Sequence, residues 1–450
     1  MTVRQSRPAL HFTAERGWIN DPNGLVFHDG YWHLFYQHHP DSLQWGPMHW
    51  GHARSCDLIT WEHLPIALEP GRLGAAFSGS AVVDHDGTAG FGTGAVVAIY
   101  TLNSDTGQTQ AIAHSSDGIL FTPFSGNPVL LQPPDCKDFR DPKVFRYNDS
   151  WIMVLAVGTQ VWIYQSVDLR NWSLTSRYTD KPASDWGTWE TPDLFPLPHP
   201  VHGEPVWVLT IGMTSDAPAG GGGTYYRTGM FDGTTFTSTD GTGHWADHGP
   251  DFYAPQSWSG TGDRRVVLAW MNNWRYSNDS PHGVSRGIMS LAREVHLELV
   301  DGGLLLAQRP VLNLGELAGE LRTIPVGTTT ITDVGRATAC SMNVRGVDQL
   351  SFKGALLDDT VKISIDGETR LIVVERSGPV AERIDGFTLR HECLVPGHGN
   401  FDAAIVFDSG SVEVFAASGT LSITMLTSHV VMPQTLCIHT TVELEVRTVA

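Results

Sequence analysis

The sequence has few basic residues and no long apolar run. Its 450 residues contain 29 lysines and arginines against 48 aspartates and glutamates, which gives a formal net charge of −19. Proteins that bind nucleic acid or an anionic membrane surface by charge need the opposite sign. No segment approaches the roughly 18 uninterrupted apolar residues of a membrane span. We therefore expect neither nucleic acid nor a membrane as a partner.

Cysteine is also scarce. The five cysteines are scattered and none forms a CxxC pair, so a zinc ribbon or a dense disulfide framework is excluded. The N-terminal segment 1–18 lacks the apolar run of a signal peptide. These features predict a reduced, cytoplasmic protein, although a secreted chain whose leader had been removed would look the same.

Glycine, proline and the aromatic residues are plentiful and unevenly placed. The 47 glycines and 26 prolines indicate many turns and favour short strands over long helices. All 15 tryptophans lie between Trp18 and Trp274, and all 10 tyrosines lie between Tyr31 and Tyr276. This break predicts two domains with different roles. Aromatic surfaces in the first would suit a sugar ligand.

The first part contains a degenerate repeat. An aspartate stands four residues before an aromatic residue at Asp57, Asp117, Asp168 and Asp232, and apolar runs typical of strands lie between these positions. The aspartate would form a turn, and the aromatic residue would enter the next strand. Roughly 300 residues at about 55–60 per unit predict five blades of a β-propeller. Chance recurrence of aspartate turns in a β protein is the alternative.

From about residue 325 the pattern changes to alternating strands separated by Asp-Gly and Ser-Gly turns, which is typical of a β-sandwich. The predicted architecture is therefore all-β, a five-bladed β-propeller followed by a C-terminal β-sandwich. We place the propeller at 1–305, a linker at 306–324 and the sandwich at 325–450.

Three carboxylates have unusual settings. Asp21, Asp141 and Glu190 each lie within two residues of a proline and beside another polar or aromatic residue, one in each of three early repeats. Proline restrains the backbone and can orient a neighbouring carboxylate, although Asp-Pro is also a common turn. Three acids among many tryptophans fit glycoside hydrolysis, in which one carboxylate attacks, one protonates and a third stabilises the transition state.

Other chemistries find less support. His49 and His52 form an HxxH pattern, but on a strand the two rings do not converge on a metal. Ser78 lacks the GxSxG context of a serine hydrolase. Gly220–Gly223 is not followed by the Lys-Ser/Thr of a phosphate loop, and we interpret it as a flexible loop over the site. No metal or cofactor is expected.

The motifs also resemble a known family. Segment 18–68, which begins WINDPNG, resembles the opening of glycoside hydrolase family 32, the invertases, levanases and inulinases. The motifs FSGS (77–80), FRDP (139–142) and ETPD (190–193) follow in the family's order, and DSGSVEVF (408–415) resembles its sandwich module. The resemblance covers most of the chain and implies the same propeller and sandwich.

The resemblance implies roles for individual residues. Asp21 matches the nucleophile, Asp141 the transition-state stabiliser and Glu190 the acid/base. Residues that match positions lining the fructose pocket are Asn20, Gln37, Trp45, Phe77, Ser78 and Arg140. Trp274 is a candidate pocket wall or, alternatively, a buried blade aromatic. Thr191 departs from the family, which usually has cysteine after the acid/base.

The predicted function is that of a retaining β-fructosidase, which removes terminal β-D-fructofuranosyl residues from sucrose, fructo-oligosaccharides or fructans. A fructosyltransferase on the same scaffold would share the fructosyl-enzyme. A non-catalytic fructan-binding protein would be expected to lose one of the three acids. An inverting propeller glycosidase would need carboxylates farther apart. Linkage preference, and whether the protein is a monomer or a homodimer, stay open.

Three structural expectations follow from this mechanism. The carboxyl groups of Asp21 and Glu190 should lie about 5–5.5 Å apart. Hydrogen bonds should keep the pKa of Asp21 low, whereas Glu190, flanked by Trp186 and Trp189, should have the raised pKa. The sandwich should supply no catalytic group.

Overall fold

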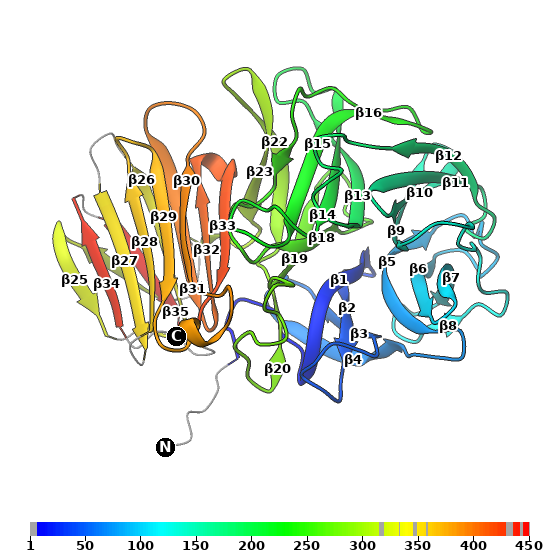
Figure 1. Cartoon of the computed structure of the whole chain (residues 1–450), viewed down its shortest axis with the longest axis horizontal. Coiled ribbons are helices and arrows are strands. Elements are labelled where there is room, and N and C mark those ends of the chain that lie inside the picture. The colour runs from blue at the N-terminus through cyan, green and yellow to red at the C-terminus, as the bar shows by residue number, and fades with distance from the viewer. Residues whose placement is uncertain are drawn as a thin grey trace.

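The structure is a computed structural model that describes residues 7–314, 319–332, 334–344, 349–356, 359–428, 435–441 and 444–449. Across these residues the strands form seven sheets and there is no α-helix. No helix in this part of the chain could cross a membrane. Five sheets radiate around a central axis, and two face each other beside them (Figure 1). The prediction of a five-bladed β-propeller followed by a β-sandwich is confirmed.

The blades follow one another along the chain, and each has four main strands. Blade 1 contains β1 (Gly17–His28), β2 (Tyr31–His39), β3 (His49–Ser55) and β4 (Trp61–Leu68), with β20 (Ser285–Arg286) parallel to β1. Blade 2 contains β5 (Ala75–Asp84), β6 (Ala95–Ser104), β7 (Gly107–Ser115) and β8 (Thr122–Pro123). Blade 3 contains β9 (Phe139–Tyr147), β10 (Ser150–Val157), β11 (Gln160–Ser166) and β12 (Ser173–Tyr178).

The last two blades carry short extra strands. Blade 4 contains β13 (Trp189–Pro198), β14 (Pro205–Met213), β15 (Gly223–Phe231), β16 (Phe236–Ser238) and β17 (His244–Trp245). Blade 5 contains β18 (Tyr253–Ser257), β19 (Val266–Met271), β22 (Arg293–Val300) and β23 (Gly303–Pro310), with β21 (Ile288–Met289) beside β19.

The sandwich consists of two six-stranded sheets. The first has the order β24 (Gly319–Ile324), β35 (Leu444–Val449), β26 (Ala337–Val344), β31 (Phe401–Asp408), β32 (Ser411–Ala416) and β33 (Leu421–Leu426). The second has the order β25 (Gly327–Ile331), β34 (Thr435–Thr440), β27 (Gln349–Leu356), β28 (Asp359–Asp366), β29 (Leu371–Ser377) and β30 (Leu389–Leu394). Two 3-10 turns, η2 (Ala381–Arg383) and η3 (Ala417–Gly419), lie between strands.

The first strand of every blade lines the central axis. β1 contacts β5 and β18, β9 contacts β5 and β13, and β13 contacts β18, so the five inner strands form a closed ring. A separate apolar cluster fills the wedge between each pair of neighbouring blades. The ring brings the starts of all five inner strands to one end of the axis.

Packing between blades explains the break in aromatic composition. Trp50, Trp189 and Trp258 are fully buried in clusters between neighbouring blades, because large flat side chains fill a wedge that widens away from the axis. Trp45, with 45% of its surface exposed, is the large exception. Most of the tryptophans therefore serve packing between blades, and a sugar-binding role stays a prediction for the exposed ones.

The repeated aspartates form the turn before the outermost strand. Asp57 accepts the backbone N–H groups of Ile59 and Thr60, and Asp117 and Asp168 make the same contacts in blades 2 and 3. Leu58, next to Asp57, has a φ of +65°. In each turn the aspartate carboxylate thus accepts the hydrogen bonds of backbone N–H groups, as the repeat predicted.

The structure corrects the predicted linker of 306–324. β23 continues to Pro310 in blade 5, and β24 begins at Gly319 and pairs with β35 in the sandwich. Both ends of the predicted linker therefore belong to sheets, because the backbone groups of β23 pair with the neighbouring β22 and those of β24 pair with the distant β35. Residues 315–318 lie outside the described residues.

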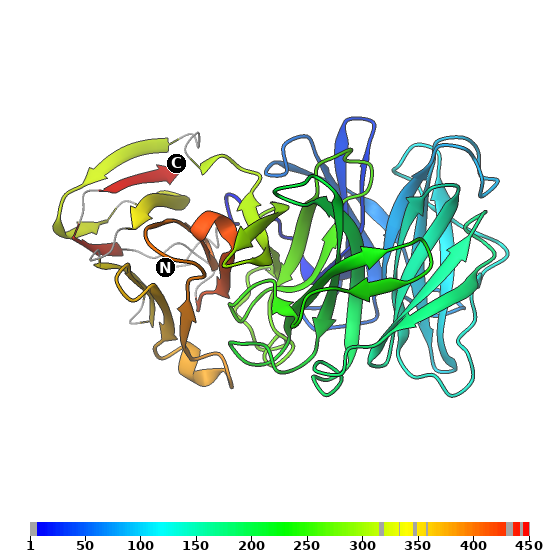
Figure 2. The same cartoon turned by 90° about the horizontal axis from the view of Figure 1, so that it is seen from above.

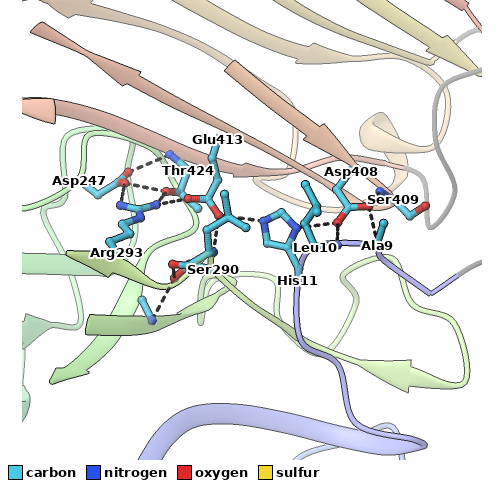
Figure 3. Close-up of polar contacts among 12 residues, drawn as sticks. Ala9, Leu10, His11, Asp247, Ser290, Arg293, Asp408, Ser409, Glu413 and Thr424 are labelled. Carbon is cyan, nitrogen blue, oxygen red and sulfur yellow. Dashed lines mark hydrogen bonds and ion pairs between the residues drawn. The ribbon is translucent and has the colours of Figure 1, made fainter. Parts of the chain in front are cut away.

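The two domains pack side by side (Figure 2), and buried ion pairs cross between them. Arg293 of blade 5 contacts Glu413 of β32, and Arg376 of β29 contacts Asp251 of the propeller at 3.0 Å. His11 in the N-terminal segment lies between Asp408 and Glu413, at 2.8 and 2.9 Å (Figure 3). All these side chains are fully buried.

Candidate active site

Each inner strand carries a β-bulge near its start. In the bulges the pairing register shifts around these equivalent residues: Asp21, Ser78, Asp141, Thr191 and Ala254. Each is followed by proline or glycine. A bulge leaves residues unpaired and redirects them, so these residues surround the axis at one end. Asp21 and Asp141 occupy equivalent positions, whereas Glu190 lies one residue earlier in its strand.

As expected, the three acids come one from each of three repeats. Blades 1, 3 and 4 supply them, and blade 2 contributes Ser78 at the equivalent position. The ring of inner strands, rather than adjacency in sequence, is what brings the three carboxylates together.

Asp21 is held by two side-chain donors. Asn20 Nδ2 donates to Oδ1 at 3.0 Å, and Ser78 Oγ donates to Oδ2 at 2.7 Å. Asn20 is in turn oriented by Trp18, whose indole N–H donates to its amide oxygen at 2.8 Å. The carboxylate therefore has both oxygens in a defined orientation.

Asp141 is held mainly by the backbone. The Thr191 N–H donates to its Oδ2 at 2.9 Å, and its own N–H donates to Thr101 Oγ1 at 3.0 Å. Asp141 has a φ of +64° and Thr191 a φ of +47°, conformations that the bulges impose and that turn the Thr191 N–H toward the carboxylate. Arg140 Nε lies 3.9 Å from the same oxygen.

Glu190 has a cation on one side and a phenol on the other. Arg140 donates to Oε1 at 2.8 Å, and the Tyr253 hydroxyl donates to Oε2. Arg140 also contacts Asp138 at 2.5 Å. The side chain of Glu190 is 19% exposed against 6% for Asp141, so solvent or a leaving group can reach Glu190 more readily.

The expected surroundings of Glu190 are wrong. Trp186 stacks on Trp245, and Trp189 is buried against Tyr178 between blades 3 and 4. Trp186 precedes β13, and the side chain of Trp189 packs in the apolar cluster between blades 3 and 4 rather than beside the Glu190 carboxylate. Tyr253 takes their place. Sequence reasoning did not select Tyr253, although it stands at the start of an inner strand, one residue before a bulge, as Glu190 does.

The electrostatics of the carboxylates also differ from expectation. The pKa of Asp21 is raised to about 6: burial raises it most, the charge of Glu190 adds to the rise, and hydrogen bonds from Ser78 and Asn20 offset the rise only in part. The prediction of a low pKa for Asp21 is therefore wrong, because desolvation outweighs the hydrogen bonds. Burial raises the pKa of Asp141 too, with Arg140 opposing the rise and the other two carboxylates adding to it.

The remaining predicted pocket residues contact aromatic rings or the backbone of blades 1 and 2. Trp45 contacts Phe77 edge to face, with ring centroids 5.7 Å apart, and Trp274 stacks on Trp18 at 6.3 Å. Trp274 is half-buried, which fits a wall better than a core aromatic. The Gln37 amide donates to the Ala76 carbonyl at 3.0 Å, so it links blade 1 to the inner strand of blade 2.

The glycine-rich segment is tied to the site. The Asn273 amide donates to the carbonyls of Gly220, Gly222 and Pro250. A Cβ at Gly222 would lie 3.0 Å from the Tyr253 ring, so glycine allows the backbone to approach that ring without displacing it. The segment therefore packs against the tyrosine that holds Glu190, and its flexibility stays a prediction.

The departure at Thr191 has a limited effect on the carboxylates. Its side chain is buried, and Oγ1 has no hydrogen-bond partner among the described residues. Thr191 contacts Asp141 through its backbone N–H. The substitution of cysteine by threonine therefore leaves the hydrogen-bonded frame of the three acids intact.

The HxxH histidines have other partners. His52 Nε2 lies 3.0 Å from His33 Nδ1 within blade 1, and His49 Nδ1 lies 3.2 Å from the Pro47 carbonyl oxygen. Across the residues that the structure describes, no group of three or more metal-ligating side chains comes together.

In the described part of the chain, the hydrogen-bond partners of the three carboxylates all belong to the propeller. The set comprises a buried carboxylate with both oxygens oriented, a more exposed carboxylic group beside an arginine, and a third carboxylate beside both. This arrangement can supply a nucleophile, a proton donor and a stabilising charge to a sugar ring.

Comparison with known proteins also indicates a glycoside hydrolase. The family model "Glycosyl hydrolases family 32 N-terminal domain" matches residues 11–310. A levanase of Bacillus subtilis is 41% identical over 447 residues, which cover 93% of this chain and 66% of the levanase. The chain thus spans about two thirds of that levanase.

Solved structures resemble the whole chain. The exo-inulinase of Aspergillus awamori has a TM-score of 0.88 at 30% identity, over 98% of both chains. A β-fructofuranosidase of Schwanniomyces occidentalis complexed with fructosyl-erythritol has a TM-score of 0.88 at 28% identity, over 98% of this chain and 97% of that chain.

Proposed function

The chain belongs to glycosyl hydrolase family 32, and from that premise we propose that it is a retaining β-fructosidase. It removes terminal β-D-fructofuranosyl residues from sucrose, fructo-oligosaccharides or fructans such as levan and inulin. The observation that carries this proposal is the convergence of Asp21, Asp141 and Glu190 from three blades, each held by named donors. The names of the similar levanase, exo-inulinase and β-fructofuranosidase support the substrate class.

In the first step Asp21 attacks the anomeric carbon while Glu190 donates a proton to the leaving oxygen. The bond from the anomeric carbon to that oxygen breaks, and an ester to Asp21 forms. Asn20 and Ser78 orient the attacking carboxylate. Asp141 binds ring hydroxyls and its charge stabilises the cation-like transition state.

In the second step Glu190 accepts a proton from water, and the water oxygen attacks the anomeric carbon. The ester bond breaks, Asp21 regains its charge and fructose leaves with retained configuration. Tyr253 and Arg140 keep Glu190 in place through both steps. A separation of about 5–5.5 Å between the carboxyl groups of Asp21 and Glu190 stays a prediction of this mechanism.

The alternative is a fructosyltransferase, which uses the same fructosyl-enzyme and resolves it with a sugar hydroxyl. Incubation with sucrose, levan and inulin, followed by chromatography, separates the two. Free fructose as the product supports hydrolysis, whereas difructose or longer products support transfer.

Stereochemistry tests the mechanism directly. Reaction of sucrose in the presence of methanol should yield methyl β-D-fructofuranoside, which proton NMR distinguishes from the α anomer. The α product would show inversion and contradict the ester intermediate.

Asp149→Asn, at an exposed turn in blade 3, is the matched control for substitutions of aspartates in the site.

A further inference from the structure

A second cleft opens toward the other end of the propeller axis. It has a volume of about 610 Å³, within the range of small-molecule sites. Its walls come from later residues of the same inner strands that carry the carboxylates at their starts: Lys143–Asn148 follow Asp141 in β9, and Asp193 follows Glu190 in β13. The cleft is therefore separate from the carboxylate pocket.

The charge of this cleft is opposite to that of the protein. Its lining includes Lys143, Arg146 and Arg265 but only one carboxylate, Asp193, in a chain with a net charge of −19. Lys143 already pairs with Asp193 at 2.9 Å and donates to the Ser257 carbonyl at 2.6 Å. The single carboxylate of the cleft is thus occupied by a cation.

Arg265 is left without an anion. Among the described residues, no carboxylate lies within ion-pair distance of its guanidinium; its contacts are Ser257 Oγ at 3.5 Å and the Phe195 ring, with the guanidinium carbon 5.2 Å from the centroid. Its Nε has no hydrogen-bond partner in that part of the chain. An arginine held in a cleft with free donors favours a ligand with a planar or tetrahedral oxyanion.

The rest of the cleft is apolar and aromatic. Tyr147, Trp207 and Phe231 form one wall, with ring centroids 4.9–5.7 Å apart, and Met230 lies at the opening with 63% of its surface exposed. Such a wall suits a ring or another flat apolar body. We propose that this cleft is a binding site for a small organic anion, whose carboxylate or phosphate binds Arg265 and whose body packs on the aromatic wall.

The test uses phenylphosphonate and benzoate as probes and benzyl alcohol as their neutral counterpart. Binding to the whole chain is followed by saturation-transfer NMR and by calorimetry. One or both anions should bind and benzyl alcohol should not; comparison of the two anions decides between phosphate and carboxylate. Saturating fructose should leave anion binding unchanged, since fructose would occupy the other end of the axis.

Variants locate the site. Arg265→Met keeps the aliphatic stem and should weaken anion binding at least tenfold, and Arg265→Lys should weaken it less. Met230→Asp places a negative charge at the opening and should also weaken binding, whereas Val201→Asp, at a similarly exposed position outside the cleft, should not. Melting temperatures check that each variant is folded.

Three results would overturn the proposal. One is equal binding to wild type, Arg265→Met and Met230→Asp. Another is equal binding of benzyl alcohol, which would mean that charge is not recognised. The third is displacement of the anion by fructose, which would place it at Arg140 in the carboxylate pocket.

Discussion

The buried histidine between the two domains makes stability depend on pH in a defined way. Burial by itself would lower the pKa of His11, but hydrogen bonds and charges from Asp408 and Glu413 raise it from 6.5 to about 9. A group whose pKa is raised on folding stabilises the folded state fully below its unfolded pKa, and this contribution disappears as the pH rises through the folded pKa. The loss should therefore fall between about pH 6.5 and 9.

The magnitude follows from the size of the rise. At about 1.4 kcal/mol per pH unit, a rise from 6.5 to about 9 corresponds to about 3 kcal/mol. Unfolding entropy is roughly 2 cal/mol/K per residue, so cooperative unfolding of 450 residues converts about 3 kcal/mol into a change of about 3 °C in melting temperature. Glu413, whose pKa Arg293 and His11 lower to about 2 against the effect of burial, loses its contribution only below about pH 4.5.

The perturbation is His11→Gln, measured by calorimetry at pH 6 and pH 9.5. The variant should melt at least about 3 °C below wild type at pH 6, and the difference should shrink by about that amount at pH 9.5. His398→Gln is the control, because His398 is 89% exposed and pairs only with exposed Asp301. An equal difference at both pH values would refute the reasoning, since it would mean that His11 is neutral in the folded protein.

Four predictions concern the carboxylate pocket. Asp21→Asn should remain folded and lose sucrose hydrolysis by several orders of magnitude, because an amide cannot form the ester; more than a few per cent of residual activity would contradict this role. Glu190→Ala should slow sucrose cleavage far more than cleavage of fructosyl fluoride, which needs little protonation, and equal losses would point to another acid. Ser78→Ala should move the acid limb of the kcat/KM profile to higher pH, because the hydrogen bond from Ser78 lowers the pKa of Asp21 and its loss should raise that pKa above about 6; an unmoved limb would mean that Asp21 does not set it. Tyr253→Phe should lower kcat for sucrose about tenfold with a smaller effect on fructosyl fluoride, and a change in KM alone would show that Tyr253 acts in binding instead.

Short-range patterns account for the parts of the fold that could be predicted. The aspartate turns use partners two and three residues ahead, so their sequence signal is complete within a few positions. The alternating strands after residue 325 likewise carry their pattern locally. The linker prediction failed at its C-terminal end because pairing of β24 with β35 joins segments more than a hundred residues apart. Its N-terminal end instead belongs to a local hairpin of β22 and β23.

The three acids could be selected from the sequence because each lies within two residues of a proline, in or next to a bulge, and the bulge is a local feature. Tyr253 is not acidic, so a search for carboxylates does not select it. Its role depends on contact with Glu190, 63 positions earlier. The interdomain arginines are similar cases: Arg376 meets Asp251 across 125 positions.

The sequence by itself determined the strand and turn pattern, the five-fold repeat and the identity of the three carboxylates, because these depend on residue types within a few positions of one another. Only the tertiary structure decided which neighbours surround each carboxylate, how far burial raises the pKa of Asp21, and which charges pair between the domains. Those properties depend on the distances between groups and on their desolvation. Both are set when the ring of inner strands closes and the sandwich packs against the propeller.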